Sequence, residues 1–344
     1  MPDSDIYMQR AIELARLGGV KTKTNPNVGA VLVHADAIIG EGYHKQYGGS
    51  HAEIEALTSV SDDKMHLIAD STMYVTLEPC CIHSKTPPCT DAIIKAGIKK
   101  LVVGCRDPHK PMNGQSIDLL RAEGIEVLEA ADFKSQCEDL IRPFIAHLQK
   151  RPYVILKWAQ TLDNYIGKRD QQLWLSNDFS KVKSHTWRSE VDAILVGYNT
   201  VVTDDPKLTT RLVNGPNPMR IVLDRDASLN SEYAVCNKEA STLIINGAGR
   251  EEQLDSIRYH TIGEGDNFVA ELLAYLFEEG VCYLMVEGGT KTINKFINAK
   301  LWDEARIIKV HKQLRSGIAA PRLGGRRFKC EFMHSDRIDY VYPS

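Results

Sequence analysis

Several features that assign a chain to a class are missing from this sequence. No apolar run approaches the length of about 20 residues that crosses a bilayer. The segment 1–10 has no basic stretch followed by an apolar one, so we expect no secretory signal. A formal net charge of -3 gives no general attraction for nucleic acid or an anionic membrane. We therefore expect a cytoplasmic protein that acts on a small molecule, without a nucleic-acid or membrane partner.

Internal repeats, low-complexity segments and the G-x-G-x-x-G fingerprint of a standard dinucleotide site are absent too. What is present is a globular composition, with 344 residues of which 43% are hydrophobic and 25% charged. This length is comfortable for two domains, and Lys150–Pro152 is a plausible joint between a domain 1–149 and a domain 150–344. Eight cysteines in a reducing compartment indicate metal ligands or packed thiols rather than a disulfide frame.

Apolar periodicity and turn signals divide the first half into alternating helices and strands. Helices are predicted at 5–17, from Ser50, at 90–96, 115–123 and 132–149. Strands are predicted at 28–33, 38–42, 73–77, 101–105 and 125–128. Alternation of this kind predicts an α/β fold with crossover connections and a sheet covered on both faces.

One imidazole and two thiols in this half form a pattern suited to zinc. His51, Cys80 and Cys89 supply three ligands of the type that zinc prefers, which leaves a coordination position for water. Each is expected at the end of a helix or strand, so that the three side chains face one cleft. Glu53, two residues after His51, can carry a proton beside that water, as in the zinc deaminases of bases. The pattern therefore predicts a catalytic zinc site with Glu53 as acid and base.

Two structural interpretations compete with this one. Ser50 and Glu53 have the spacing of a capping box, in which Glu53 would only satisfy amides at a helix start. A structural zinc site would need a fourth ligand, which Cys81 or His83 could supply. Adjacent residues point their side chains apart, so only one of Cys80 and Cys81 is expected to bind, and Cys80 follows a proline. The other thiols are expected to pack in the core: Cys105, Cys137, Cys236, Cys282 and Cys330.

The second half of the chain also alternates between predicted strands and helices. Strands are predicted at 153–157, 193–197, 220–223, 242–245 and 283–286, with helices at 178–190, 267–279 and 291–298. The segment 198–211 is polar and rich in turn residues. After the last apolar strand comes Glu287–Thr290, where two glycines can bring backbone amides against a phosphate. A turn with two glycines is common, so this signal by itself is weak.

The motifs of the first half resemble the cytidine-deaminase-like fold, and more closely the bifunctional deaminase–reductase family of riboflavin biosynthesis. The matching segments are Asn25–Gly29, Gly42–His44, His51–Glu53, Thr76–Cys80 and Thr86–Cys89. Eight residues lie between the two thiols, and this long loop separates the family from nucleoside and tRNA deaminases. The resemblance implies that His51, Cys80 and Cys89 hold one zinc ion and that Glu53 shuttles protons. It also implies that Asn25, His44 and Lys85 contact the substrate and its phosphate.

The second half resembles the reductase half of the same family, which has a dihydrofolate-reductase-like fold and uses NADPH. The match is carried by Pro152–Lys157, Trp174–Ser176, Ala193–Gly197, Leu208–Arg211 and Val286–Gly289. The implied cofactor contacts are Trp174, Ser176, Thr200, Asp204, Gly288, Gly289 and Thr290. The implied substrate contacts are Lys157, Gln172, Arg188, Leu208, Arg211 and Glu287.

Some positions depart from the family pattern. Ile82 and Ser84 stand where the family usually has His and Gly, and Asn164 stands where it tends to have Gly. The segments 107–110 and 311–314 also differ, and no role is assigned to the basic segment 315–329. These changes leave the metal ligands untouched.

The resulting hypothesis is that one chain catalyses two successive steps. Zinc-dependent hydrolysis would deaminate 2,5-diamino-6-(5-phosphoribosylamino)pyrimidin-4(3H)-one, and NADPH would then reduce the ribosyl group to a ribityl chain. The enzyme is expected to form a homo-oligomer. The alternative is a base, nucleoside or tRNA deaminase with a non-catalytic C-terminal domain, which predicts a short P-C-x-x-C loop and, for tRNA, a basic face.

Overall fold

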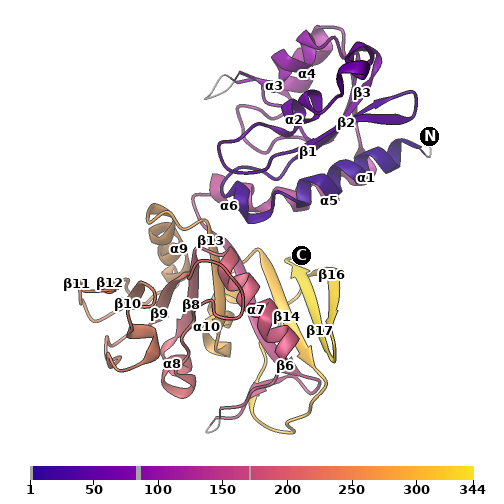
Figure 1. Cartoon of the computed structure of the whole chain (residues 1–344). Coiled ribbons are helices and arrows are strands. Elements are labelled where there is room, and N and C mark those ends of the chain that lie inside the picture. The colour runs from indigo at the N-terminus through magenta and orange to yellow at the C-terminus, as the bar shows by residue number, and fades with distance from the viewer. Residues whose placement is uncertain (1–2, 83–86, 170–171) are drawn as a thin grey trace. The chain divides into compact units, whose positions relative to one another are not determined.

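The computed structural model describes residues 3–82, 87–169 and 172–344. The chain divides into two compact units, Met1–Gln149 and Lys150–Ser344 (Figure 1). Within the described residues, no helix is both long enough and apolar enough to cross a membrane.

The first unit is built on a five-stranded sheet with the order β2-β1-β3-β4-β5. β1 pairs antiparallel with both β2 and β3, whereas β3, β4 and β5 run parallel. The strands are β1 (Gly29–His34), β2 (Ala37–Tyr43), β3 (Thr72–Leu77), β4 (Lys100–Cys105) and β5 (Glu126–Glu129). The α-helices are α1 (Asp3–Arg16), α2 (Ala52–Thr58), α3 (Cys89–Lys95), α4 (Gln115–Ala122), α5 (Lys134–Leu140) and α6 (Arg142–Leu148). Short 3-10 helices are η1 (Gly19–Thr22), η2 (Asp62–Asp70) and η3 (Ala131–Phe133).

Helices cover both faces of this sheet, with α1 and α5 on one face and α2, α3 and α4 on the other (Figure 1). The central strands are therefore buried on both sides and read as continuous apolar runs. α1 lies so close to β1 that a Cβ at Gly29 would stand 2.0 Å from the carbonyl oxygen of Ala11. In the same way, a Cβ at Gly42 would stand 2.3 Å from the backbone nitrogen of Ala56 in α2. Glycine at these two positions allows the helices to dock on the sheet.

Three sequence-based predictions differ from the structure. α2 begins at Ala52 with His51 as its N-cap, and no side chain caps it. The competing capping-box interpretation is therefore wrong, because Glu53 is the second helical residue instead of the third. The helix predicted at 132–149 is split between α5 and α6 near Pro143, which has no N–H to continue the first helix. The segment 198–211 is predicted to be rich in turns, but its first part is helical.

The second unit contains a ten-stranded sheet with the order β11-β12-β10-β9-β8-β13-β6-β14-β17-β16. The strands from β12 to β14 in this order are parallel, and β11, β17 and β16 are antiparallel additions at the edges. The first strands along the chain are β6 (Tyr153–Thr161), β8 (Ala193–Gly197), β9 (Met219–Leu223), β10 (Thr242–Asn246) and β11 (Glu252–Leu254). The later ones are β12 (Ile257–Thr261), β13 (Tyr283–Gly288), β14 (Glu304–Val310), β16 (Arg326–Met333) and β17 (Asp336–Tyr342). A separate pair joins β7 (Tyr165–Gly167) to β15 (Ile318–Ala319).

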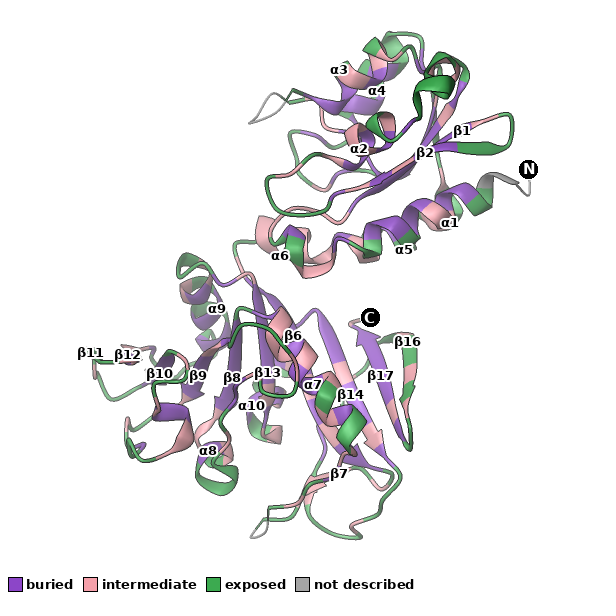
Figure 2. Ribbon diagram, in the orientation of Figure 1, coloured by how far each residue is buried: buried purple, intermediate pink, exposed green. Residues whose placement is uncertain are grey.

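Helices surround the middle of this second sheet. They are α7 (Asp178–Glu190), α8 (Tyr198–Asp204), α9 (Phe268–Glu278) and α10 (Thr290–Ala299), with the 3-10 helix η4 (Ala234–Cys236). Apolar side chains of α9 and α10 share one core with those of the central strands. Figure 2 shows these strands buried and the edge strand β16 largely exposed. α8 follows the carboxyl end of β8, and α10 follows that of β13, which is the sheet edge where parallel α/β folds bind ligands.

The contact at Gly29 generates a prediction about stability. Substitution Gly29→Ala should lower the free energy of unfolding of the first unit by about 2–3 kcal/mol, because the added methyl group overlaps the backbone of α1. Gly263→Ala is the control, since its Cβ would meet no atom within 4 Å. Thermal unfolding of both variants measures the effect, and equal melting temperatures would contradict the packing argument.

Candidate functional site

Three predicted metal ligands meet at one point in the first unit. His51 is the N-cap of α2, Cys80 follows the end of β3, and Cys89 is the first residue of α3. Their ligand atoms all lie within 4.8 Å of one another. His51 Nδ1 is 3.2 Å from Cys89 Sγ and 3.5 Å from Cys80 Sγ. With Zn–N near 2.0 Å and Zn–S near 2.3 Å, tetrahedral zinc would separate N from S by roughly 3.5 Å. The spacing and the donor set fit this ion.

The two thiols are electrostatically unequal. Hydrogen bonds from the Cys89 thiol and then from His51 lower the pKa of Cys80 to about 4. The Cys89 backbone N–H also points at Cys80 Sγ, at 3.3 Å. The same hydrogen bond between the thiols, together with burial, raises the pKa of Cys89. Both sulfurs would bind zinc as thiolates, so loading the site would release the thiol protons.

Glu53 lies in the first turn of α2 and is only 3% exposed. Burial raises the pKa of its carboxyl group, although the nearby imidazole of His51 acts in the opposite direction. The carboxyl group also contacts the Cys89 thiol. A buried carboxyl group with a raised pKa beside a metal cluster is suited to accept and return a proton.

Cys81, one of the two competing ligands for a structural site, is not in the cluster. The Cys81 thiol is directed at Met112 Sδ, 3.9 Å away. Within residues 3–82, 87–169 and 172–344, the only group of metal-ligating side chains close enough to share an ion is His51, Cys80 and Cys89. His83 and the predicted phosphate contact Lys85 lie outside the described residues. The described part of the chain therefore leaves a coordination position open for water.

Asn25 and His44 lie beside the metal ligands. Asn25 Nδ2 donates to His44 Nε2 at 3.0 Å, and His44 Nδ1 donates to the carbonyl of Ser50 at 2.9 Å. Burial lowers the pKa of His44, which favours the neutral ring that this arrangement requires. The rings of His44 and His51 are nearly perpendicular, with centroids 5.9 Å apart. The two predicted substrate contacts are thus placed next to the zinc cluster.

Glu78 supports the site in a way that sequence analysis missed. Its buried carboxylate accepts hydrogen bonds from the backbone N–H groups of Asp107 (3.1 Å), Gly114 (2.9 Å) and Ser116 (3.2 Å). The Ser116 hydroxyl donates a fourth, at 2.6 Å. These bonds tie the loop between β4 and α4 to the end of β3, two residues before Cys80. The signal in the sequence is a charged residue between apolar Leu77 and Pro79.

In the second unit, three predicted substrate contacts form a buried ion cluster. Glu287, at the end of β13, accepts two hydrogen bonds from Arg188 of α7, at 2.9 and 2.7 Å. Lys157 of β6 places its Nζ 3.7 Å from the same carboxylate. Although burial opposes ionisation, Arg188 and Lys157 lower the pKa of Glu287 to about 2. Burial lowers the pKa of Lys157, and Glu287 opposes that shift.

The segment that contains Leu208 and Arg211 lies against this cluster. Arg188 Nη1 donates to the carbonyl of Thr209 at 3.4 Å, and Arg211 Nη1 donates to the Thr209 hydroxyl at 2.9 Å. The backbone N–H of Arg211 donates to His185 Nδ1 at 3.0 Å. Sequence analysis did not single out His185, although it lies one helical turn before Arg188.

Most of the predicted cofactor contacts gather around α8 and the start of α10. The Gly289 N–H donates to the Thr200 hydroxyl at 3.1 Å, and a Cβ at Gly289 would stand 3.3 Å from the same oxygen. Gln172 Nε2 donates to the carbonyl of Asp204 at 3.1 Å. Thr290 Oγ1 donates to the carbonyl of Ala319 at 2.7 Å. Gly288 and Gly289 therefore lie beside Thr200.

Trp174 and Ser176 are on a different segment, directly before α7. Trp174 is 68% exposed, and the Lys181 ammonium lies 5.2 Å from the centre of its ring. Lys312 Nζ donates to the carbonyls of Trp174 and Leu175, at 3.2 and 2.8 Å. In the described part of the chain, no hydrogen bond or ion pair joins Trp174 or Ser176 to the group around Thr200.

Comparison with known protein families identifies the two units. Residues 152–338, more than half of the chain, match the RibD C-terminal domain. The chain belongs to the RibD family. Residues 1–105 match the cytidine and deoxycytidylate deaminase zinc-binding region. The family predicted from the motifs is thus confirmed, with a cytidine-deaminase-like unit followed by a dihydrofolate-reductase-like unit.

Relatives match along most of their length. The riboflavin biosynthesis protein RibD of Aquifex aeolicus is 36% identical over 327 residues, which cover 93% of this chain and 90% of that one. The Escherichia coli protein of the same name is 30% identical and covers 87% and 85%. A deaminase/reductase structure from Thermotoga maritima has 34% identity and a TM-score of 0.83 over 99% of both chains. Acinetobacter baumannii RibD has 28% identity and a TM-score of 0.80, over 100% of this chain and 99% of that one.

One departure from the RibD pattern has a clear structural explanation. Asn164 stands where the family usually has glycine. Its φ of 61° lies in the left-handed region, which asparagine tolerates better than most residues. Gln160 Nε2 donates to its side-chain oxygen at 2.7 Å. The turn between β6 and β7 is therefore kept without glycine.

The neighbouring thiols provide a matched test of the metal centre. Cys80→Ser should reduce bound zinc from about one ion per chain to a small fraction, because one of three protein ligands is lost. Cys81→Ser should leave the zinc content unchanged, because that thiol faces Met112. Elemental analysis of the purified variants measures both. Loss of zinc in Cys81→Ser, with zinc retained in Cys80→Ser, would reverse the assignment.

The ion cluster predicts how stability depends on pH. The pKa of Glu287 falls from its usual 4.5 to about 2 on folding. Its ionised form therefore stabilises the second unit above about pH 4.5, by roughly 3 kcal/mol at 1.36 kcal/mol per pKa unit, and this contribution is lost as the pH falls toward 2. Glu287→Gln should flatten the pH dependence of urea unfolding in this range. The exposed Glu271→Gln is the control, and identical pH profiles for the two variants would contradict the prediction.

Proposed function

We propose that this chain catalyses two successive reactions of riboflavin biosynthesis, each in one unit. Residues 1–149 hydrolytically deaminate 2,5-diamino-6-(5-phosphoribosylamino)pyrimidin-4(3H)-one, and residues 150–344 reduce the product with NADPH. The observation that carries the proposal is the cluster of His51, Cys80 and Cys89 with buried Glu53 beside it, in a chain whose second unit matches the RibD C-terminal domain. The deaminase/reductase from Thermotoga maritima joins the same two activities in one chain.

In the deaminase unit, His51, Cys80 and Cys89 would hold zinc, which would make a bound water nucleophilic near neutral pH by lowering its pKa. Glu53 accepts the proton of that water and delivers it to the exocyclic nitrogen, which leaves as ammonia. Asn25 and His44, hydrogen-bonded to each other beside the cluster, orient the pyrimidine. The role of Lys85 as a phosphate contact stays a prediction, outside the described residues.

In the reductase unit, bound NADPH would supply a hydride to the ribosyl carbon that is bonded to nitrogen, while the bond from that carbon to the sugar ring oxygen opens and the oxygen takes a proton to become a hydroxyl of the ribityl chain. Gly288, Gly289 and Thr290 lead into α10, whose free N-terminal amides and positive end would face cofactor phosphate. Thr200, Asp204, Trp174 and Ser176 complete the cofactor site. Lys157, Gln172, Arg188, Leu208, Arg211 and Glu287 bind the substrate.

The charge of this cluster supports a phosphorylated substrate. Lys157, Arg188 and Arg211 contribute three positive charges, and Glu287 contributes one negative charge. The excess of positive charge in a partly buried site attracts an anion strongly, because water screens it little. A substrate that carries a phosphate meets this requirement.

The alternative of a base, nucleoside or tRNA deaminase with a non-catalytic second domain is not favoured. The match of residues 152–338 to the RibD C-terminal domain assigns that half to a reductase family.

We also propose that the enzyme is a homo-oligomer in the cytoplasm. All eight cysteines are free thiols, as a reducing compartment requires.

Glu53→Gln tests the separation of the two activities. Deamination should fall by a factor of about 10²–10⁴, because the proton carrier is lost while the shape of the side chain is kept. Zinc content and NADPH-dependent reduction of the deaminated intermediate should remain. Lys157→Met is the reciprocal variant, in which reduction falls and deamination persists. If Glu53→Gln abolished both activities with zinc retained, the two-site proposal would be wrong.

A further inference from the structure

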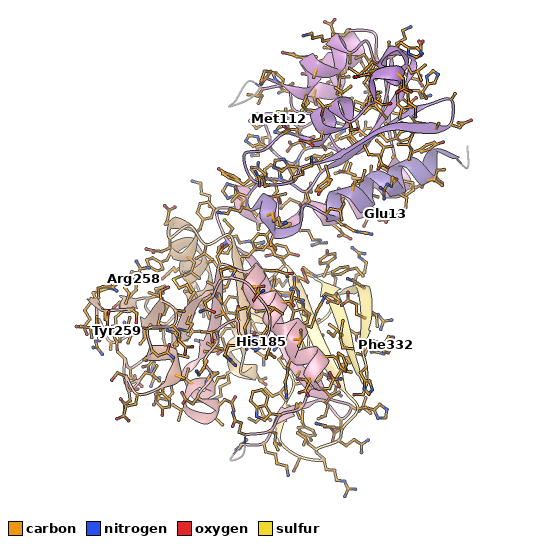
Figure 3. All side chains as sticks on the ribbon, viewed as in Figure 1. Glu13, Met112, His185, Arg258, Tyr259 and Phe332 are labelled. Carbon is orange, nitrogen blue, oxygen red and sulfur yellow. The ribbon has the colours of Figure 1, made fainter. Side chains whose placement is uncertain are left out.

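A buried histidine of α7 takes no part in the reactions as described so far. His185 is 6% exposed and lies one turn before Arg188 (Figure 3). Its Nδ1 is 3.0 Å from the backbone nitrogen of Arg211, whose N–H donates to it. Nδ1 must therefore carry no proton, and in the neutral ring the proton is on Nε2.

The backbone that His185 contacts belongs to the irregular segment between α8 and β9. Leu208 has a φ of 54°, which is strained for a branched side chain, and the segment forms no regular helix or strand. Side chains hold it in place: Asn217 Oδ1 accepts from the Thr210 N–H at 2.8 Å, and Arg188 donates to the Thr209 carbonyl. His185 supplies the acceptor for the next N–H, which would be costly to leave unpaired at this part-buried position.

The charges around His185 explain why a neutral acceptor suits this position. Arg188, Arg211 and Lys157 lie near the ring, together with the carboxylate of Glu287. Burial, then Arg188 and Arg211, lower the pKa of His185 to about 4, so the ring is uncharged at physiological pH. A carboxylate in its place would cancel one of the positive charges that face the substrate. The imidazole anchors Arg211 and leaves those charges available.

We propose that His185 is a positioning residue of the reductase, which fixes the backbone of Arg211 so that its guanidinium meets the anionic group of the substrate. The guanidinium is steadied in turn by the Thr209 hydroxyl, 2.9 Å from Arg211 Nη1. This inference rests on the proposed function, in which Arg211 binds substrate. His185 itself acts through Arg211 and touches neither substrate nor cofactor in this scheme.

Two neutral amides at position 185 provide a matched comparison. In His185→Asn, the side-chain oxygen takes the place of Nδ1 and keeps the acceptor for Arg211. In His185→Gln, the oxygen is one bond farther out, near the place of Nε2, and the acceptor is lost. With the full chain, NADPH and the deaminated substrate, His185→Gln should raise KM for substrate about tenfold. His185→Asn should stay within about threefold of the wild type, and both variants should keep the wild-type kcat and Kd for NADPH within about twofold.

A double-mutant cycle distinguishes positioning from a general structural role. In an Arg211→Ala background, His185→Gln should raise KM no further, because the residue through which it acts is gone. The inference is overturned if the Asn and Gln variants have the same KM, or if His185→Gln raises KM equally in both backgrounds. Absence of NADPH-dependent reduction in the wild type would instead overturn the proposed function, and the inference with it.

Discussion

The close docking of α2 on the sheet is the constraint from which the metal centre follows. Gly42 leaves the backbone of β2 near that of Ala56, and this contact sets the position of the helix. His51 is the residue that starts α2, so the place of its imidazole is decided by the same contact. β3 and α3 bring the two thiols to it from either side. The packing of the unit therefore brings the three ligand atoms together.

The two units use a buried glutamate for opposite purposes. Among the described residues no arginine or lysine is bonded to Glu53, and burial raises the pKa of its carboxyl group. Glu287 accepts two hydrogen bonds from Arg188 and lies beside the charge of Lys157, so it stays ionised. In the proposed function, the same carboxyl group is a proton carrier in one site and a fixed anion in the other, because the neighbouring charges differ.

Neutral imidazoles have a related role in both units. His44 links Asn25 to the carbonyl before His51, and His185 holds the backbone of Arg211. Burial keeps both rings uncharged, so each can accept a hydrogen bond beside groups whose charge matters for the reaction. Each ring fixes the position of a functional residue and leaves the net charge of the site unaltered.

The sequence alone determined the family, the alternation of helices and strands, and the chemical identity of the zinc ligands, because residue type, local periodicity and short spacing carry that information. Only the tertiary structure decided which groups interact over long separations. Arg188 meets Glu287 across 99 residues, and Glu78 collects amides from a loop 29 to 38 residues away. The tertiary structure also decided that Glu53 is buried instead of capping α2, because the docking of the helix on the sheet decides which residue begins it. Local pattern cannot settle such matters, because the partner that supplies each charge, amide or contact is brought close only when the chain folds.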